Sequence, residues 1–248
     1  MTISGYHQVQ EFHEVFGHPL NTSLQFNIFT ENPKLVDFRI SLIDEEIKEF
    51  IDACSKKDFI EAIDAIADIM YVVYGAMHVF GVNYDSYTSL SPLLYTTSYN
   101  NNDNINVFDT NKSELLKETK KLELYLSMLN KNKNLLNFND FVKHLDNIIC
   151  ECYTISSLFN IDIDKCFAEV HRSNMSKVCT SEEEALQTVI WYKKNEKRYT
   201  DPTYRKSSNS KYWIVFDNTT SKILKSIHFE LPKLSIICFN NQIIDNFE

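Results

Sequence analysis

This chain of 248 residues is poor in the residues that make turns, with only four glycines and five prolines. Such scarcity favours helices over a sandwich of many short strands, which needs frequent turns. Apolar runs of about 18 residues or more are also missing, which argues against a membrane-spanning segment. Residues 1–19 lack a basic end followed by an apolar stretch, so we expect no secretory signal.

Positive charge is scarce as well. The formal net charge is −9, from 25 Lys and Arg against 34 Asp and Glu, so the basic footprint of a nucleic-acid-binding protein is lacking. The six cysteines are scattered, and the close pair Cys150 and Cys152 has no second pair to complete a zinc site. We therefore expect reduced thiols and a cytoplasmic location.

The hydrophobic pattern predicts an all-α protein with a small C-terminal β-hairpin. Helices are expected over 38–54, 58–80, 113–130, 138–160 and 164–196. Residues 84–112 are rich in Asn and lack helical periodicity, which indicates a long linker or loop. The β-like runs 211–217 and 222–231 lie on either side of Asn-Thr-Thr-Ser and predict the hairpin.

An internal similarity suggests that a pair of helices occurs twice. The segments that align are 67–83 with 146–162 and, more weakly, 41–50 with 114–124. The second copy has lost acids, since Asp64 falls on Lys143 at the same offset. Either the chain holds two related helical pairs, or the similarity is the ordinary likeness of amphipathic helices.

Carboxylates gather along the first two long helices. The six acids are Glu45, Glu46, Glu49, Glu61, Asp64 and Asp68. Positions three, four and seven apart share a helix face, so each helix carries its acids at the edge of its apolar side. If the helices pack antiparallel, the acids meet and repel unless cations neutralise them. Mg²⁺ fits such an oxygen-rich cluster best, with Mn²⁺ as the alternative; two solvated helix faces are the other interpretation.

The motifs resemble those of a known superfamily. "EEIKE" followed by "EAIDAIADIMYVVYG" is similar to the E-E-x-x-E and E-x-x-D pattern of the all-α nucleoside triphosphate pyrophosphohydrolases. This MazG-like superfamily includes the dimeric dUTPases and phosphoribosyl-ATP pyrophosphohydrolase. "EFHEVFGHP" (11–19) and "HRSNMSK" (171–177) resemble segments of its phage- and virus-type branch. The resemblance implies a MazG-like four-helix bundle.

The resemblance also implies a reaction, hydrolysis of a nucleoside triphosphate to a monophosphate and pyrophosphate. Expected substrates are dUTP, dCTP or a non-standard deoxynucleotide. By position, Glu45 would orient the attacking water. Metal ligands would be Glu46, Glu49, Glu61 and Asp64, with Asp68 as a further ligand or a neighbour of one. Substrate contacts would come from Arg172, Asn174, Lys177, Tyr204, Arg205 and Lys206, for each of which an ordinary surface role is the alternative.

In simpler relatives the acidic helices lead directly to the "HxSNMSK" segment, whereas here a second helical pair intervenes. We therefore predict a tandem pseudo-dimer in one chain, whose second half completes the bundle and supplies the nucleotide-binding segment. The expected parts are a metal-bearing half (1–83), a linker (84–112), a second half (113–196) and a basic tail with the hairpin (197–248). Association of pseudo-dimers into homo-oligomers is left open. Two other functions stay open: hydrolysis of phosphoribosyl-ATP, and a non-enzymatic helical module that binds metal or a basic partner.

Overall fold

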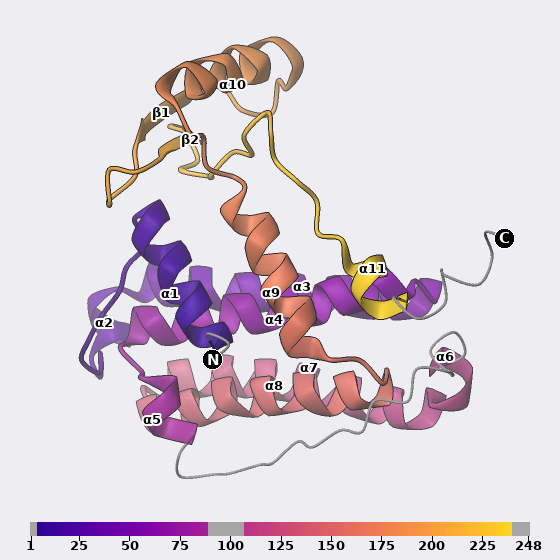
Figure 1. The fold of residues 1–248 in the computed structure, drawn as a ribbon. Helices are drawn as coiled ribbons and strands as arrows, with labels where there is room; N and C mark the ends of the chain where they lie inside the picture. Colours follow the sequence, from indigo (N-terminus) through magenta and orange to yellow (C-terminus); the bar gives the residue numbers. More distant parts are fainter. Residues whose placement is uncertain (1–3, 89–106, 240–248) are drawn as a thin grey trace, which may run out of the picture.

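The computed structural model describes residues 4–88 and 107–239, and the chain there is mainly helical (Figure 1). The helices are α1 (Gly5–Phe16), α2 (Ile28–Glu31), α3 (Pro33–Lys56), α4 (Phe59–Phe80), α5 (Tyr84–Thr88), α6 (Val107–Thr110), α7 (Lys112–Asn134), α8 (Phe138–Leu158), α9 (Ile163–Met175), α10 (Glu182–Asn195) and α11 (Leu234–Phe239), and the strands are β1 (Pro202–Lys206) and β2 (Trp213–Asp217). The predicted all-α class with a small C-terminal hairpin is confirmed. Of the predicted linker, residues 89–106 lie outside the described residues.

The body of the molecule is a bundle made from two helical hairpins. The α3–α4 hairpin packs on the α7–α8 hairpin, with α4 against α8 and α3 against α7, while α1 and α9 cross one side of the bundle (Figure 1). Because α1, α3, α8 and α9 all contact α4, that helix is buried along most of its length. By length and composition α4 could cross a membrane, but 83% of its apolar stretch is buried inside this fold.

Local capping explains where the two acidic helices begin. The Asp58 side chain accepts a hydrogen bond from the backbone N–H of Glu61, which starts α4 at the expected place. The first long helix begins at Pro33, five residues before the predicted start at 38. Asn32 caps it by accepting from the N–H of Leu35, and proline is tolerated in a first turn because it lacks the N–H that would be unpaired there.

The single helix predicted over 164–196 is wrong, because the chain forms α9 and α10 with a break between them. At the break the backbone of Cys179 pairs with that of Trp213 in β2, through N···O distances of 2.7 and 2.8 Å. Ser181 then caps α10 by accepting from the N–H of Glu184. As a result α10 packs against the hairpin instead of the bundle.

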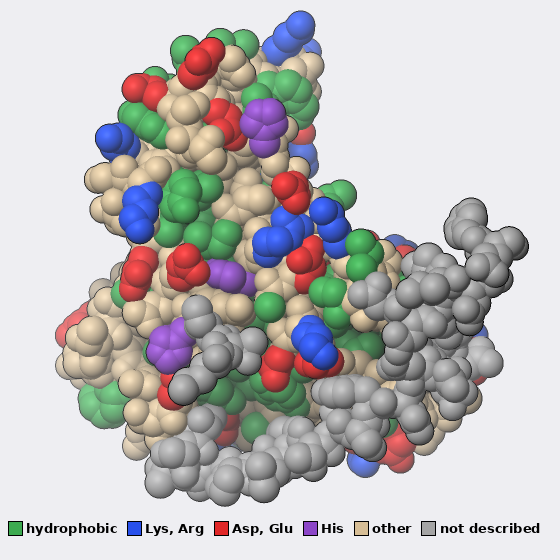
Figure 2. All heavy atoms as spheres, viewed as in Figure 1, with side chains coloured by type: hydrophobic (Ala, Val, Ile, Leu, Met, Phe, Trp, Pro, Cys, Tyr) green, Lys and Arg blue, Asp and Glu red, His purple; other side chains and the backbone are tan. Residues whose placement is uncertain are grey.

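Residues 178–229 form a C-terminal lobe with a small core of its own. That core consists of Cys179, Ala185, Val189, Tyr192, Val215 and Leu224. The lobe is joined to the bundle through a narrower neck, where acidic and basic side chains lie side by side on the visible face (Figure 2). All six cysteines of the chain fall within the described residues and are free thiols.

The hairpin contains one predicted strand but not the other. Strand β2 pairs antiparallel with β1, and its predicted pairing with 222–231 is limited to residues 222–224, through backbone hydrogen bonds of Asp217 to Lys222 and of Leu224 to Val215. After β2, Asp217 closes a turn by accepting from the N–H and hydroxyl of Thr220. The chain then makes one isolated bridge, between Phe216 and Ile223, and leaves the lobe. We call residues 222–233 the strap; it runs from the lobe down to α11, which packs on α4 and α9 (Figure 1).

Candidate active site

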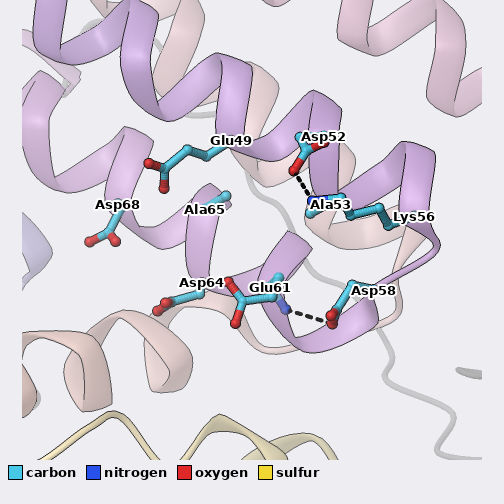
Figure 3. A pocket seen from close by; sticks show the side chains of 9 residues that line it. All are labelled: Glu49, Asp52, Ala53, Lys56, Asp58, Glu61, Asp64, Ala65 and Asp68. Atoms are coloured by element: carbon cyan, nitrogen blue, oxygen red, sulfur yellow. Dashed lines mark hydrogen bonds and ion pairs between the residues drawn. The ribbon is translucent and has the colours of Figure 1, made fainter.

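An open cavity of about 350 Å³ lies between α3 and α4, near the turn that joins them. Its lining residues are Glu49, Asp52, Ala53, Lys56, Asp58, Glu61, Asp64, Ala65 and Asp68. The carboxylates of Glu49, Asp64 and Asp68 extend toward the same open space, two of them from α4 and one from α3 (Figure 3). The helical spacing of these acids and the antiparallel packing of the two helices therefore place acids of both helices in one cavity.

Burial and like charge make these carboxylates hard to ionise. Burial raises the pKa of Glu46 to about 8, and the nearby charges of Asp68, Glu49 and Glu45 add to the effect. Burial followed by the charge of Asp64 raises the pKa of Asp68 to about 7. The pKa of Asp64 rises to about 6 for the same two kinds of reason. A cluster of carboxylates of this kind suits a bound cation, because a nearby positive charge would lower their pKa values and favour the ionised form.

The residues present fit a hard divalent cation. All the candidate ligands offer oxygen atoms, as Mg²⁺ requires, and Asp64 Oδ1 is buried without a hydrogen-bond partner among the described residues. As the side chains stand, no three His, Cys, Asp or Glu residues within 4–88 and 107–239 converge closely enough to enclose an ion. The structure thus gathers the acids around one cavity but leaves their side chains spread, so ion binding would draw them together.

The remaining predicted acids lie beside the cavity. Glu46 is half-buried on α3 and is affected by the charges of Asp64 and Asp68, although it is outside the cavity lining. Glu45, the predicted water-orienting base, is exposed one position earlier and likewise does not line the cavity. Asp52, which the sequence interpretation missed, does line it and pairs with Lys56 at 2.5 Å. Its spacing of three residues from Glu49 could have revealed it.

One residue of the "HRSNMSK" segment supplies positive charge to this region. The charge of Lys177 lowers the pKa of both Asp64 and Asp68. Its Nζ donates to Asn174 Oδ1 at 2.6 Å and stands 6.0 Å from the centre of the Phe12 ring. Burial lowers the pKa of Lys177, and the charge of Asp68 opposes that shift. The hydrogen bond to Asn174 therefore holds the ammonium group of Lys177 in place.

The two motifs that carried the family resemblance meet beside α4. His171, in the second motif, lies 3.1 Å from the hydroxyl of Tyr71 on α4 and 3.3 Å from a carboxylate oxygen of Glu11, in the first motif. These contacts join α1 and α9 to the helix that carries three of the acids. The two motifs thus pack together on α4, outside the cavity lining.

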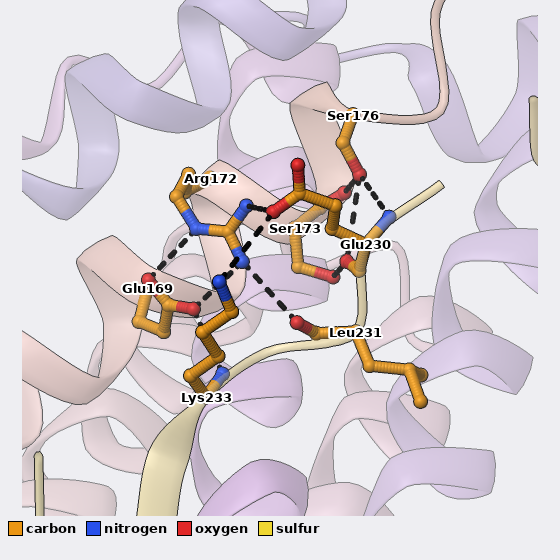
Figure 4. A network of polar contacts seen from close by, with 7 residues as sticks. All are labelled: Glu169, Arg172, Ser173, Ser176, Glu230, Leu231 and Lys233. Carbon is orange, nitrogen blue, oxygen red and sulfur yellow. Dashed lines mark hydrogen bonds and ion pairs between the residues drawn. The ribbon is translucent and has the colours of Figure 1, made fainter. Parts of the chain in front are cut away.

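Arg172 is not brought to the cavity. Its guanidinium makes two hydrogen bonds to Glu169, at 2.8 and 2.9 Å, and a third to Glu230 in the strap at 2.8 Å (Figure 4). Both carboxylates therefore neutralise the charge that we expected to meet a phosphate.

Nor does any of the three predicted residues of the basic tail line the cavity. The Tyr204 hydroxyl lies 3.3 Å from Glu182 inside the lobe. Arg205 donates to the carbonyl of Phe16, at the end of α1, at 2.7 Å. Lys206 lies over the Trp213 ring, 5.5 Å from its centre. Arg205 joins the lobe to the bundle, whereas the other two make contacts within the lobe.

Comparison with known proteins agrees with this picture at the level of the family. Residues 9–89 match the phosphoribosyl-ATP pyrophosphohydrolase family. An uncharacterized protein of Acanthamoeba polyphaga mimivirus, L479, is 38% identical over 243 residues, which cover 94% of each chain and so include the bundle and the lobe. No solved structure matches. The chain belongs to the same family as the mimivirus protein, and its first third carries a domain of the nucleotide pyrophosphohydrolase type.

Proposed function

We propose that this protein is an Mg²⁺-dependent nucleoside triphosphate pyrophosphohydrolase, which converts a (d)NTP and water into a (d)NMP and pyrophosphate. The observation that carries the proposal is the shared cavity of α3 and α4, where acids from both helices surround a buried, unpartnered oxygen of Asp64. The substrates we favour are dUTP and dCTP, with non-standard deoxynucleotides, which the cell would have to keep out of DNA, as a further possibility.

The proposed metal ligands are the acids at the cavity and next to it, Glu46, Glu49, Glu61, Asp64 and Asp68. Mg²⁺ bound there would neutralise the phosphate oxygens and lower the pKa of a coordinated water. Phosphoryl transfer depends mainly on such positioning and charge neutralisation, so the protein needs no covalent nucleophile. Glu45, exposed on α3 next to Glu46, is the group we propose to orient the attacking water.

Lys177 would act on the substrate rather than on the metal. Its half-buried side chain would offer a point charge to a phosphate oxygen of the substrate. The hydrogen bond to Asn174 fixes the lysine before substrate arrives, which reduces the entropy lost on binding. The amide of Asn174 retains N–H donors that could bond to a base or a sugar.

A second candidate is hydrolysis of phosphoribosyl-ATP, which the description of the matching family favours. Both substrates present a polyphosphate to be cleaved by metal-assisted attack of water, so the carboxylates alone do not separate them. A third interpretation, a helical module that binds metal without catalysis, is the outcome if no phosphoanhydride bond is hydrolysed.

The deciding experiment incubates the purified full-length chain and Mg²⁺ with a panel of ribo- and deoxynucleoside triphosphates and with phosphoribosyl-ATP. We expect a nucleoside monophosphate and pyrophosphate, identified by chromatography, with one pyrimidine or non-standard deoxynucleotide preferred. Glu49→Gln should abolish the signal, whereas Glu123→Gln, the same exchange at an exposed position of α7, should leave it intact. Turnover of phosphoribosyl-ATP alone would favour the second candidate, and no turnover at all would favour the binding module.

A further inference from the structure

The strap follows a defined path across the neck between the lobe and the bundle. On the lobe side, the N–H of Lys225 donates to the hydroxyl of Tyr192 at 3.1 Å, and the hydroxyl of Ser226 bonds to Glu184 at 2.5 Å. The N–H of Ser226 donates to the carbonyl of Lys177 at 3.3 Å. Lys225 is therefore next to a residue that is bonded to the backbone of Lys177.

On the bundle side, the strap is bonded to "HRSNMSK" itself (Figure 4). The Ser173 hydroxyl donates to the carbonyl of Glu230 at 2.8 Å, and the N–H of Glu230 donates to the Ser176 hydroxyl at 2.9 Å. Arg172 donates to the Glu230 carboxylate and, at 3.2 Å, to the carbonyl of Leu231. Three residues of this segment thus hold the strap instead of facing the cavity.

Two lysines lie in the first part of the strap, and Lys225 directly precedes Ser226, whose N–H donates to the carbonyl of Lys177. The charge of Lys225 acts on Asp64 and Asp68, and the charge of Lys222 acts on Lys177. Both lysines are exposed, and neither forms an ion pair with an acid of residues 4–88 or 107–239. The Lys225 ammonium group lies 4.2 Å from the centre of the Phe229 ring, a contact that restrains it without neutralising it.

We propose that Lys225, with Lys222 beside it, binds the polyphosphate of the substrate from the side opposite α3 and α4, and that Arg172 is a positioning residue that holds the strap. The proposal rests on the proposed function, because it concerns the phosphates that this reaction cleaves. A triphosphate carries more negative charge than one lysine offsets, and the strap brings two further ammonium groups that have no acidic partner in the part of the chain that the structure describes. The polyphosphate side would therefore be built from the strap and Lys177, with the carboxylates facing it.

The test compares Lys225→Gln and Lys222→Gln with Lys211→Gln, an exposed lysine in the β1–β2 turn of the same lobe. The full-length chain is used with Mg²⁺, and inorganic pyrophosphate is the probe. We expect Lys225→Gln to raise KM for the nucleotide and the inhibition constant of pyrophosphate by about tenfold each, since a lost charge-assisted contact is worth roughly 1.4 kcal/mol. The kcat should change less than about threefold, and Lys222→Gln should show a smaller effect in the same direction.

Inhibition by the nucleoside monophosphate separates a phosphate contact from general damage to the site, and Lys225→Gln should leave it almost unchanged. Arg172→Gln should raise KM in the same way, with Arg172→Lys restoring part of it. The double variant Arg172→Gln/Lys225→Gln should cost less than the sum of the two, since both act through the strap. Additive effects would overturn the positioning role of Arg172.

Unchanged KM and pyrophosphate inhibition in Lys225→Gln, or an equal loss in Lys211→Gln, would overturn the strap site. Calorimetry with Mg²⁺ and pyrophosphate distinguishes this failure from failure of the proposed function. A wild-type chain that binds pyrophosphate through Lys225 but hydrolyses no nucleotide would contradict the reaction and keep the strap site. If the wild-type chain turns over nucleotides but binds pyrophosphate equally well without the Lys225 charge, the proposed reaction stands and the strap site is contradicted.

Discussion

The two helical hairpins of the bundle pack on each other but differ in the positive charges that lie beside their buried carboxylates. In the α3–α4 hairpin, Asp64 and Asp68 lie at an open cavity with raised pKa values, and one oxygen of Asp64 has no partner among the described residues. At the offset of the internal similarity, these two positions are Lys143 and Asn147 in α8. The second hairpin therefore lacks the stripe of acids that defines the first.

The second hairpin has its own buried acids, Glu118 on α7 and Glu151 on α8, and it places two lysines of α7 beside them. Even so, one oxygen of Glu151 has no hydrogen-bond partner among the described residues, and burial, followed by the hydrogen bond with Glu118, raises its pKa to about 7. Lys117 lies 3.2 Å from Glu118, and Lys121 contacts both Glu118 and Glu151. Burial opposes ionisation of Glu118, yet hydrogen bonds involving Glu151 and Lys121 hold its pKa below the ordinary range. The difference teaches where to look for function: acids paired within their own hairpin stabilise the fold, whereas acids left unpaired need a charge from outside it.

The comparison predicts its largest effect for a matched pair of amide exchanges. Asp64→Asn should reduce pyrophosphohydrolase activity by about a hundredfold or more, because it removes a proposed metal ligand. The free energy of unfolding should stay the same or rise, since a repelling charge is lost. Glu118→Gln should keep the activity but lower the free energy of unfolding by about 1–3 kcal/mol, because a buried acceptor of Lys121 is weakened.

Steady-state kinetics and urea unfolding measure the two quantities on the same preparations. Full activity in Asp64→Asn would show that the cavity is not catalytic. Loss of activity in a well-folded Glu118→Gln would show that the second hairpin also takes part in the reaction, and the contrast between the hairpins would then be wrong.

A second way to sharpen the comparison is to titrate with Mg²⁺ while following thermal unfolding. An ion that binds only the folded chain stabilises it by about 2.7 kcal/mol at a concentration one hundred times its dissociation constant. We expect this rise in the wild type and in Glu118→Gln, and little of it in Asp64→Asn. An equal rise in all three proteins would place the ion elsewhere.

The smallest effect concerns pH and the histidines that pack on each hairpin. Burial, assisted by the charge of Arg39, lowers the pKa of His13 from its ordinary 6.5 to about 3, and its Nδ1–H donates to the carbonyl of Pro19. Below pH 6.5 the unfolded chain takes up a proton that the folded chain does not. Stability therefore falls with decreasing pH, by about 1.4 kcal/mol per unit, or about 2 kcal/mol at pH 5.

Urea unfolding at several pH values between pH 5 and pH 8 measures how the free energy of unfolding changes with pH. The wild type should lose more stability on acidification than His13→Gln does, while the curve of His144→Gln should run nearly parallel to the wild type because His144 on α8 is only half-buried. Parallel curves for wild type and His13→Gln would show that His13 is not kept neutral by the fold.

Local pattern was enough to predict the acidic helices. Helical spacing groups Asp64 and Asp68 on one face of α4 and places Glu49 on the matching face of α3. Asp58 caps α4 by accepting a hydrogen bond from the N–H of Glu61, only three residues further along the chain. Such features depend on neighbours in the chain, so the sequence states them directly. The same holds for the all-α class, which follows from periodicity and from the scarcity of turn residues.

Longer-range contacts escaped prediction for a physical reason. The helical pattern over 164–196 does not say that the backbone of Cys179 prefers Trp213, 34 positions on, to a further helical turn. Likewise Arg172 looks like a phosphate ligand until Glu230, 58 residues later, reaches its guanidinium. A charged side chain does not indicate in the sequence which partner will neutralise it.

The order of amino acids by itself determined the helices, their apolar faces and the line of carboxylates along them, because these depend on spacings of one or two turns. Tertiary structure alone decided which of the charges stay available. It paired Arg172 with Glu169 and Glu230, and it bonded the strap that carries Lys225 to the carbonyl of Lys177. Electrostatic energy depends on distance in space and on burial, and for residues so far apart in the chain only the folded arrangement sets either one.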